Sequence, residues 1–257
     1  MKQADPMFQR IAAYEEFAAN TWPALSVQCL GGWLLRSAGG YSKRANSVLP
    51  LYPSPLPVDE HIALCEEHYA RLGACTVFKM TDASQPEGLD RELERRGYRK
   101  AEEVSVQTAR LEAFGEEGAG GWDDGIERLE PEPWLEHYLA LNPGLEPHRS
   151  TISRLFGLQP NPSVYVRVGE NGTTAAVGLT AVAGRRAAVY DLMTAPGFRR
   201  RGYAGRALRA LCAEARRLGA EEAFLQVLAD NHAAIALYEK HGFREAYRQW
   251  YRIQPTR

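Results

Sequence analysis

The stretch AAVYDLMTAPGFRRRGYAGRALRALCAEARRLG, residues 187–219, changes its hydrophobic period once. Its first residues, 187–194, read as a strand. From Tyr203 onward the apolar residues recur at steps of three and four as far as Leu218, and Gly219 ends the stripe. This spacing is typical of an amphipathic helix. The stretch therefore predicts a strand, a turn and a helix.

The turn between them, RRRGYAG at residues 199–205, has the chemistry of an anion site. A turn that ends a strand and opens a helix presents unpaired backbone N–H groups, and the helix dipole favours negative charge there. Gly202 permits close approach of the backbone, Ala204 leaves room beside it, and the arginines add charge. These features fit a pyrophosphate, although a solvated basic turn is the better explanation when the segment is taken alone.

Alternating elements surround this turn. Strands are predicted at 163–168, 174–182, 223–228 and 246–253, and helices at 133–141, 149–158 and 231–240. Asn171-Gly172 is a strong hairpin signal between the first two strands. A succession of strand, helix, strand, helix and strand indicates an α/β layer architecture with a mixed sheet.

The first half of the chain repeats this ending. Helices are predicted at 58–72 and 88–96 and strands at 75–80 and 103–111, and residues 31–48 resemble a hairpin whose polar side chains are candidates for lining a substrate pocket. Setting Gly97 against Gly242, an offset of 145 positions, also aligns Tyr98 with Phe243. We interpret this as an internal duplication. A segment rich in glycine and acidic residues divides the halves, which gives domains at 1–112 and 126–257 and a linker at 113–125.

Composition excludes several classes of protein. The net charge is −1, so no global field attracts nucleic acid or an anionic membrane. The four cysteines form no CxxC pair and the six histidines have no metal-ligand spacing, so no metal site is expected, and the histidines are assigned to surface or capping positions. The N-terminal residues contain no apolar signal region, and a cytoplasmic protein without membrane contact is expected.

The second half resembles the GCN5-related N-acetyltransferase (GNAT) superfamily. That family's signature is Gln or Arg, two residues, Gly, one residue, then Gly or Ala, and Arg199, Gly202 and Ala204 fill these positions. The run NHAAIALYEKHGF at residues 231–243 resembles the family's second block. The resemblance implies two GNAT-like domains, each a mostly antiparallel sheet flanked by helices. At the offset of 145, Leu93 and Pro86 replace Tyr238 and Asn231, so the first domain is expected to be degenerate and to have no cofactor of its own.

The resemblance also implies which residues hold acetyl-CoA. The pyrophosphate is assigned to the turn, the pantetheine arm to main-chain groups of the preceding strand, and a further hydrogen bond to Asn231. The implied cofactor-binding residues are Leu192, Met193, Thr194, Arg199, Arg200, Arg201, Gly202, Tyr203, Ala204, Gly205, Asn231 and Tyr238.

Tyr238 is implied to be the general acid, and residue chemistry supports this role. An unperturbed phenol has a pKa of about 10, so it stays protonated at neutral pH and can donate to a departing thiolate. Tyr238 lies seven residues after Asn231, two helical turns on, so both side chains are expected to face one groove. A core aromatic and a helix N-cap are the structural alternatives for these two residues.

The general base is less well defined. Gln226 stands five residues before Asn231, where the branch that acetylates ribosomal proteins has a glutamate, and an amide cannot accept the proton. Asp191, a substrate carboxylate and a water chain are the remaining acceptors, and Asp191 is the best single candidate; a strand-edge carboxylate is its structural alternative.

The expected activity is N-acetylation. The primary hypothesis is transfer of an acetyl group from acetyl-CoA to the primary amine of a small molecule by direct attack in a ternary complex. A non-catalytic acyl-CoA sensor and a peptide or protein lysine or N-terminal acetyltransferase are the alternatives. The sequence leaves open the acceptor amine and the oligomeric state.

Overall fold

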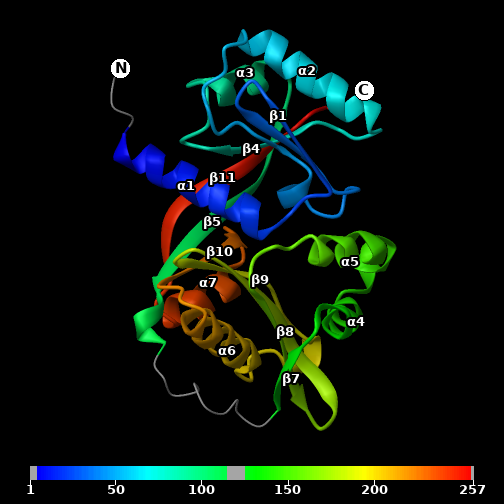
Figure 1. Ribbon diagram of the computed structural model, residues 1–257, viewed down its shortest axis with the longest axis vertical. Coiled ribbons are helices and arrows are strands. Elements are labelled where there is room, and N and C mark those ends of the chain that lie inside the picture. Colours follow the sequence, from blue (N-terminus) through cyan, green and yellow to red (C-terminus); the bar gives the residue numbers. More distant parts are fainter. Residues whose placement is uncertain (1–4, 115–124, 256–257) are drawn as a thin grey trace. The chain divides into compact units, whose positions relative to one another are not determined.

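The computed structural model describes residues 5–114 and 125–255, so most of the expected linker at 113–125 lies outside the described residues. Two units are present. The first comprises the described residues up to Ser105, Leu228–Asp230 and those from Tyr247 onward, and the second comprises Val106–Val227 and Asn231–Ala246 with the same gap. Each unit is an α/β layer with a sheet flanked by helices (Figure 1).

The helices and strands follow in order along the chain. In the first half they are α1 (Pro6–Thr21), β1 (Ser26–Leu30), β2 (Trp33–Ser37), β3 (Val48–Leu49), α2 (Val58–Arg71), β4 (Val77–Thr81), α3 (Leu89–Arg95) and β5 (Arg99–Arg110). In the second half they are β6 (Ile126–Leu129), α4 (Pro131–Leu141), α5 (Arg149–Gly157), β7 (Ser163–Glu170), β8 (Thr173–Ala183), β9 (Arg186–Thr194), α6 (Tyr203–Arg217), β10 (Glu222–Leu228), α7 (His232–Lys240) and β11 (Arg244–Ile253).

All the helices and strands predicted individually are confirmed, with ends that differ by a few residues. Two differences concern the first unit. α1 was not predicted, although Asp5 caps it through a 2.8 Å hydrogen bond from the Met7 N–H and Pro6 follows as the first helical residue. The hairpin expected at 31–48 is present as the antiparallel pair of β2 and β3, Leu34↔Leu49 and Leu35↔Val48, but a second turn at Gly31-Gly32 also joins β2 to β1, a strand that precedes the segment.

The sheet of each unit contains a strand from the other half of the sequence. Strand order in the first unit is β1-β2-β3-β4-β11, and in the second unit β5-β10-β9-β8-β7-β6, to which β5 belongs from Val106 onward. β11, the last strand of the chain, pairs antiparallel with β4 from Ile253↔Val77 to Gln249↔Thr81. β5 follows α3 of the first unit, yet its second half belongs to the second unit from Val106 onward. A boundary drawn along the sequence therefore does not separate the units, because each unit contains residues from both halves.

The geometry at Gly97 and Gly242 is the same in both halves. Their φ angles are 82° and 85°. In each case the glycine N–H bonds the carbonyl three residues back, at 2.9 and 3.0 Å, and the N–H of the following Tyr98 or Phe243 bonds the carbonyl five residues back, at 2.9 and 3.1 Å. Both helices thus end in the same left-handed turn before a strand, a turn that also ends α2 at Gly73 and α6 at Gly219, and the internal duplication stays a prediction.

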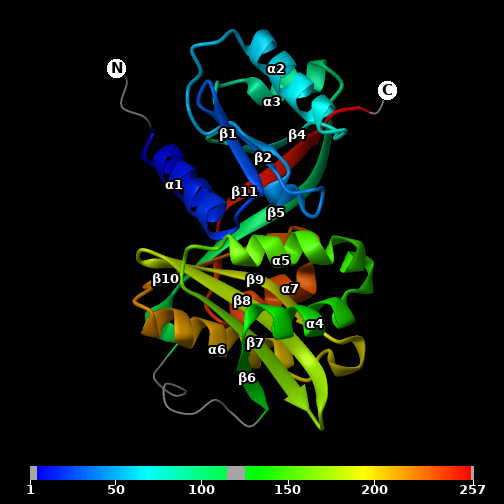
Figure 2. The ribbon, with the colours of Figure 1, turned by 45° about the vertical axis from the view of Figure 1, so that its right-hand side comes forward.

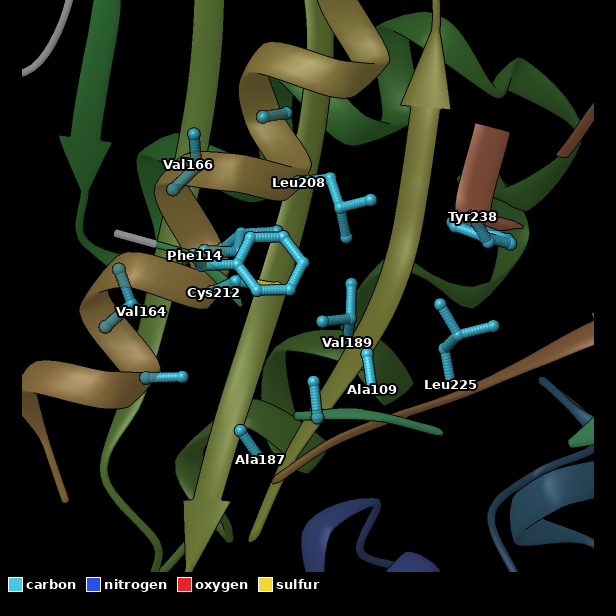
Figure 3. Close-up of a cluster of buried hydrophobic side chains, with 14 of the residues drawn as sticks. Ala109, Phe114, Val164, Val166, Ala187, Val189, Leu208, Cys212, Leu225 and Tyr238 are labelled. Carbon is cyan, nitrogen blue, oxygen red and sulfur yellow. The ribbon is translucent and has the colours of Figure 1, made fainter. Parts of the chain in front are cut away.

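The core of the second unit fills the space between its sheet and α6. Leu208 and Cys212 of α6 pack with Val164 and Val166 of β7 and with Val189 of β9 (Figure 3). α6 covers one face of these strands, and α4 and α5 cover the other (Figure 2). The long helix that follows the turn is therefore anchored by a continuous apolar contact, which fixes the position of its N-terminus.

One histidine assignment is wrong. His61 on α2 is fully buried rather than exposed or capping, and its ring stacks on Trp33 with 3.6 Å between ring centroids. Its Nε2 donates to the Leu30 carbonyl at 2.9 Å, and burial lowers its pKa. The stacking on Trp33 explains the burial of His61, because a neutral imidazole is a flat ring that can pack against an indole.

Candidate functional site

A β-bulge in β9 lies just before the candidate anion turn. β9 pairs antiparallel with β8, but the register shifts between Leu179↔Tyr190 and Val177↔Met193, so Asp191 and Leu192 together oppose the single residue Gly178. Asp191 takes the left-handed φ of 49° that such an extra residue requires. A bulge bends its strand and increases the local twist. β9 therefore changes direction at Asp191.

On the other side of β9, the pairing with β10 ends close to this bulge. β9 and β10 are parallel and paired from Arg186↔Glu222 to Val189↔Leu225, and the pairing ends there. The half-buried residues after the bulge, Leu192–Thr194, keep their pairing to β8 only. Over the described residues, the β10-facing main-chain groups of this segment have no strand partner. A strand-like ligand can occupy that edge.

The turn that follows presents backbone N–H groups at the start of α6. Arg200 and Gly202 have φ angles of 60° and 87°. The helix begins with the Arg206 N–H bonding the Gly202 carbonyl at 3.0 Å, and no side chain caps its first turn. The N–H groups of Tyr203, Ala204 and Gly205 therefore have no acceptor within the helix. Together with the helix dipole they form a cradle for an anion.

The three arginines of the turn have different surroundings. Arg199 and Arg200 are exposed. Arg201 instead bonds both carboxylate oxygens of Glu170, at 2.9 and 3.0 Å, and lies over the rings of Phe198 and Tyr203. A hydrogen bond from Tyr203, followed by the charge of Arg201, lowers the pKa of Glu170. Arg201 thus holds the turn in place, while Arg199 and Arg200 have their charges directed to solvent.

Two contacts at this turn were not anticipated from the sequence. One is Glu170, the partner of Arg201. The other is His241, whose Nδ1 donates to the Leu237 carbonyl at 2.9 Å and whose ring covers Gly205. A Cβ on Gly205 would lie 3.3 Å from Cε1 and 3.4 Å from Nε2 of that ring. The glycine directly after the signature was the available signal, since a residue without a side chain marks close approach by a neighbour.

The two candidate residues of α7 adopt the capping and core positions that were the structural alternatives. Asn231 is the N-cap, and its Oδ1 accepts from the Ala234 N–H at 3.2 Å. Tyr238 is 8% exposed and packs in the core cluster with Phe243, 5.9 Å between ring centroids. Figure 3 shows its ring in the same cluster as Val189 and Leu225, the last paired residues of β9 and β10. Tyr238 therefore lies where the two strands begin to part.

The corresponding turn of the first unit differs from the cradle at α6 in its charge and in the number of N–H groups before the helix. α2 is preceded by YPSPLP, residues 52–57, and its N-cap is Pro57. Proline has no backbone N–H, so Pro53, Pro55 and Pro57 each remove a donor. Asp59 and Glu60 occupy the first turn of α2, where their negative charge repels an anion. The start of α2 is therefore less suited to an anion than the start of α6, because it has fewer N–H groups before the helix and two carboxylates in its first turn.

Two features, a cluster of metal ligands and a membrane-spanning helix, are absent from the described part of the chain. Residues 5–114 and 125–255 contain no group of three or more His, Cys, Asp or Glu side chains arranged to hold a metal ion. Over the same ranges no helix is both long and apolar enough to cross a bilayer.

Comparison with known proteins agrees with this geometry. The model of the acetyltransferase (GNAT) family matches residues 125–243. The uncharacterized N-acetyltransferase YobR of Bacillus subtilis (strain 168) is 30% identical over 251 residues, which cover 95% of this chain and 98% of that protein. This chain belongs to the GNAT acetyltransferase family, whose members use acetyl-CoA.

Two further similarities are narrower. The [ribosomal protein bS18]-alanine N-acetyltransferase of Escherichia coli (strain K12) is 32% identical over 114 residues, 44% of this chain and 66% of that protein. A GCN5-related N-acetyltransferase from Kribbella flavida has the same fold, with a TM-score of 0.70 at 15% identity, over 99% of this chain and 98% of that one. Both units therefore belong to a known architecture.

Proposed function

We propose that this protein transfers an acetyl group from acetyl-CoA to the primary amine of a small molecule. The observation that carries the proposal is the parting of β9 and β10 after Val189 and Leu225, directly before an uncapped helix N-terminus. The first feature offers main-chain groups to an extended amide-bearing arm, and the second offers N–H groups to a pyrophosphate. Acetyl-CoA contains both groups. Its pantetheine arm carries the amides, and the pyrophosphate is attached to one end of that arm.

The binding roles follow from the contacts of each residue. Main-chain groups of Leu192–Thr194 pair with the pantetheine amides as an added strand. N–H groups from Arg200 to Gly205 bind the pyrophosphate, with the exposed Arg199 and Arg200 adding charge. The Oδ1 of Asn231 already caps α7, so its Nδ2 is the group left to donate to the pantetheine arm. When bound, acetyl-CoA supplies the thioester whose carbonyl carbon is attacked.

Two side chains move protons in this proposal. The amine arrives mostly as ammonium and must lose a proton before it attacks, because its lone pair forms the new C–N bond. We assign Asp191 at the bulge as the acceptor, directly or through a water. The C–S bond breaks as the amide forms, and Tyr238 donates its phenolic proton to the departing thiolate. The amine nitrogen loses its second proton in the same step, and that proton restores the phenol of Tyr238 through solvent. No covalent enzyme intermediate is required, since Cys212 is fully buried in the core and burial raises the pKa of its thiol.

A test of the acid combines turnover with binding. Tyr238→Phe keeps the buried ring and removes only the hydroxyl, so we expect acetyl-CoA to bind with unchanged affinity while turnover falls about 10²-fold or more. Thiol release with a panel of small amines and of peptides measures turnover, and calorimetry measures affinity. Tyr165→Phe is the matched control, because Tyr165 is also buried in the second unit but packs against Trp134 and Phe156. A Tyr238→Phe enzyme as active as the parent contradicts the assigned acid.

The same panel separates the alternatives. Gln226 stands where an acidic residue would serve as base, which motivates a second candidate, a sensor that binds acyl-CoA without turnover. Tight binding of acetyl-CoA with no acetylated product from any acceptor supports the sensor. The similarity to the bS18-alanine enzyme motivates the inclusion of peptides with N-terminal alanine, and selective acetylation of those peptides replaces the small-molecule proposal with a protein substrate.

A further inference from the structure

The edge strand β1 of the first unit lacks the usual protection of sheet edges. It pairs with β2 alone among the described strands, in an unbroken register from Ser26↔Ser37 to Leu30↔Trp33. Its sequence, SVQCL, contains no charge and no proline, and its first four residues are exposed. Natural edge strands are blunted by charges, proline or bulges, since open edges pair with other strands. β6, the edge strand of the second unit, has the charged pair Glu127-Arg128 in its centre.

The hairpin register identifies the backbone groups that point outward. The two-residue turn Gly31-Gly32, with φ angles of 50° and 90°, makes Leu30↔Trp33 a hydrogen-bonded pair. Hydrogen-bonded and non-hydrogen-bonded pairs alternate along an antiparallel ladder. The N–H and C=O groups of Val27 and Cys29 therefore point away from β2. On β2, Arg36 is the partner of Val27, and its N–H donates away from β1, to the Ser47 carbonyl at 3.2 Å, as this alternation requires.

We propose that β1 pairs antiparallel with β1 of a second copy of this chain, about a twofold axis at Gln28. In that register Val27 of each copy opposes Cys29 of the other, and each pair exchanges two hydrogen bonds. All four outward N–H groups and all four outward carbonyls of the two strands are then satisfied. The two Gln28 residues face each other as the central, non-hydrogen-bonded pair.

The chemistry of the edge selects a second copy as the partner. The outward N–H and C=O groups belong to Val27 and Cys29, one residue before and one residue after the proposed axis. A second β1 running antiparallel therefore offers matching groups, and in a twofold-symmetric pair both copies use the same surface. The absence of charge removes the repulsion that identical strands otherwise suffer. Val27 is 54% exposed and Tyr52, beside the Gly32 turn, is 40% exposed, so apolar surface accompanies the hydrogen bonds. A five-residue edge is far smaller than a standard interface of roughly 1,600 Å², and the dimer is therefore concentration-dependent.

Charge at position 28 tests the symmetry. Sedimentation of the full chain under reducing conditions is expected to show a mass that rises from that of one chain, 28.6 kDa, toward twice that value as concentration increases. Gln28→Lys places two ammonium groups opposite each other and is expected to weaken association at least about tenfold, as is Gln28→Glu. An equimolar mixture of the two variants is expected to associate again. Thr173→Lys, at an exposed position on β8, is the control that leaves association unchanged.

A disulfide tests the register. Residues in a central non-hydrogen-bonded pair have Cα atoms about 4.5 Å apart, within the range a disulfide spans. In a Cys29→Ser background, Gln28→Cys is expected to cross-link two chains on mild oxidation, whereas Ser26→Cys, which opposes Leu30 of the other copy, is not. A mass of one chain at every concentration overturns the proposal. It is overturned in the same way if the chain stays monomeric and this edge binds an extended peptide instead. Association that is indifferent to charge at Gln28 overturns it as well.

Discussion

Gly202 combines a left-handed backbone conformation with a position in the proposed pyrophosphate site. Its φ of 87° lies in the left-handed region, at the N-cap of α6, and a Cβ there would meet no neighbouring atom within 4 Å. The requirement for glycine is therefore conformational rather than steric. The left-handed turn directs the first N–H groups of the helix to one side of the chain, where an anion can meet them together.

Gly202→Ala is expected to weaken acetyl-CoA binding without unfolding the protein. The left-handed conformation costs a residue with a Cβ roughly 1–2 kcal/mol, so the turn shifts away from the cradle geometry and affinity falls about tenfold. Calorimetry should show about one site per chain for the parent, since the start of α2 has fewer N–H groups and two carboxylates in its first turn. Gly197→Ala, in the same loop and with open space at its Cβ position, should bind as the parent does. Unchanged affinity in Gly202→Ala argues against the cradle.

Asp191 combines a strained backbone with a titratable side chain at the bulge. As the proposed base it acts only on the proton of the amine, so Asp191→Asn is expected to lower turnover at neutral pH and to leave acetyl-CoA affinity unchanged. The defect should shrink as pH rises toward the pKa of an ordinary alkylamine, about 10, because the amine then loses its proton to solvent. The pH profile of turnover measures this. A defect of the same size at every pH would assign Asp191 a purely structural role.

Among the elements, β11 is attached to the first unit by charge as well as by its ladder. Arg252, 5% exposed at its side chain, bonds both carboxylate oxygens of Asp90 on α3 at 2.9 and 2.7 Å, and the indole of Trp250 donates to the same carboxylate at 2.6 Å. The hydrogen bond from Arg252, then the one from Trp250, lower the pKa of Asp90 against the opposing effect of burial. The last strand is therefore held by a network and not only by strand pairing.

Asp90→Asn is expected to lower the free energy of unfolding by roughly 2 kcal/mol at neutral pH, the scale of a hydrogen bond to a charged group. The pKa of Asp90 is lower when folded than when unfolded, so its stabilisation is complete above the ordinary carboxyl pKa of about 3.9 and is lost as pH falls through the folded value. The difference between parent and variant in urea unfolding should therefore narrow below about pH 4. Asp59→Asn is the control, because Asp59 pairs with Arg96 at an exposed position where ion pairs contribute little. Equal effects of the two substitutions would contradict the network.

At the scale of the whole molecule, the first unit depends on the end of the chain. β11 supplies the strand beside β4, and the Tyr247 hydroxyl donates at 2.7 Å to Glu15, which also forms a buried ion pair with Lys79 at 2.6 Å. Burial lowers the pKa of Lys79, and Glu15 opposes that effect. The folded first unit therefore includes residues that follow the whole of the second unit in the sequence.

A fragment of residues 1–105 is expected not to fold by itself. It lacks β11, so β4 loses a strand partner, Glu15 loses a hydrogen bond from Tyr247, and Asp90 loses Arg252. Leaving buried charges with missing partners costs several kcal/mol, comparable to the stability of a small domain. Near-ultraviolet circular dichroism and proteolysis should show a fragment without fixed packing, next to the full chain as reference. A cooperative unfolding transition in the fragment would show that the unit is independent of β11.

Most helices and strands, and the order of the candidate site residues along the chain, could be predicted from the sequence. Strand and helix periods predicted β7 to β11 and α4 to α7, because side-chain burial repeats at two residues in a strand and at about 3.6 in a helix. Gly202 and Gly242 were informative because left-handed turns favour glycine. Asn231 and Tyr238 were found through the spacing of a family pattern, which no period of burial would have given.

The division of the elements between the two units, and the contacts that hold the turn at residues 199–205, could not be predicted from the sequence. The exchange of β5 and β11 depends on pairing between residues far apart in sequence, and alternation of side chains is the same whichever strand lies beside it. The register shift at Gly178, which parts β9 from β10, depends on one extra residue that no pattern counts. The Glu170 and His241 contacts at the turn arise because strands and helices distant in sequence meet there. Local propensity specifies the elements, whereas the candidate site is formed by the mismatch between neighbouring strands.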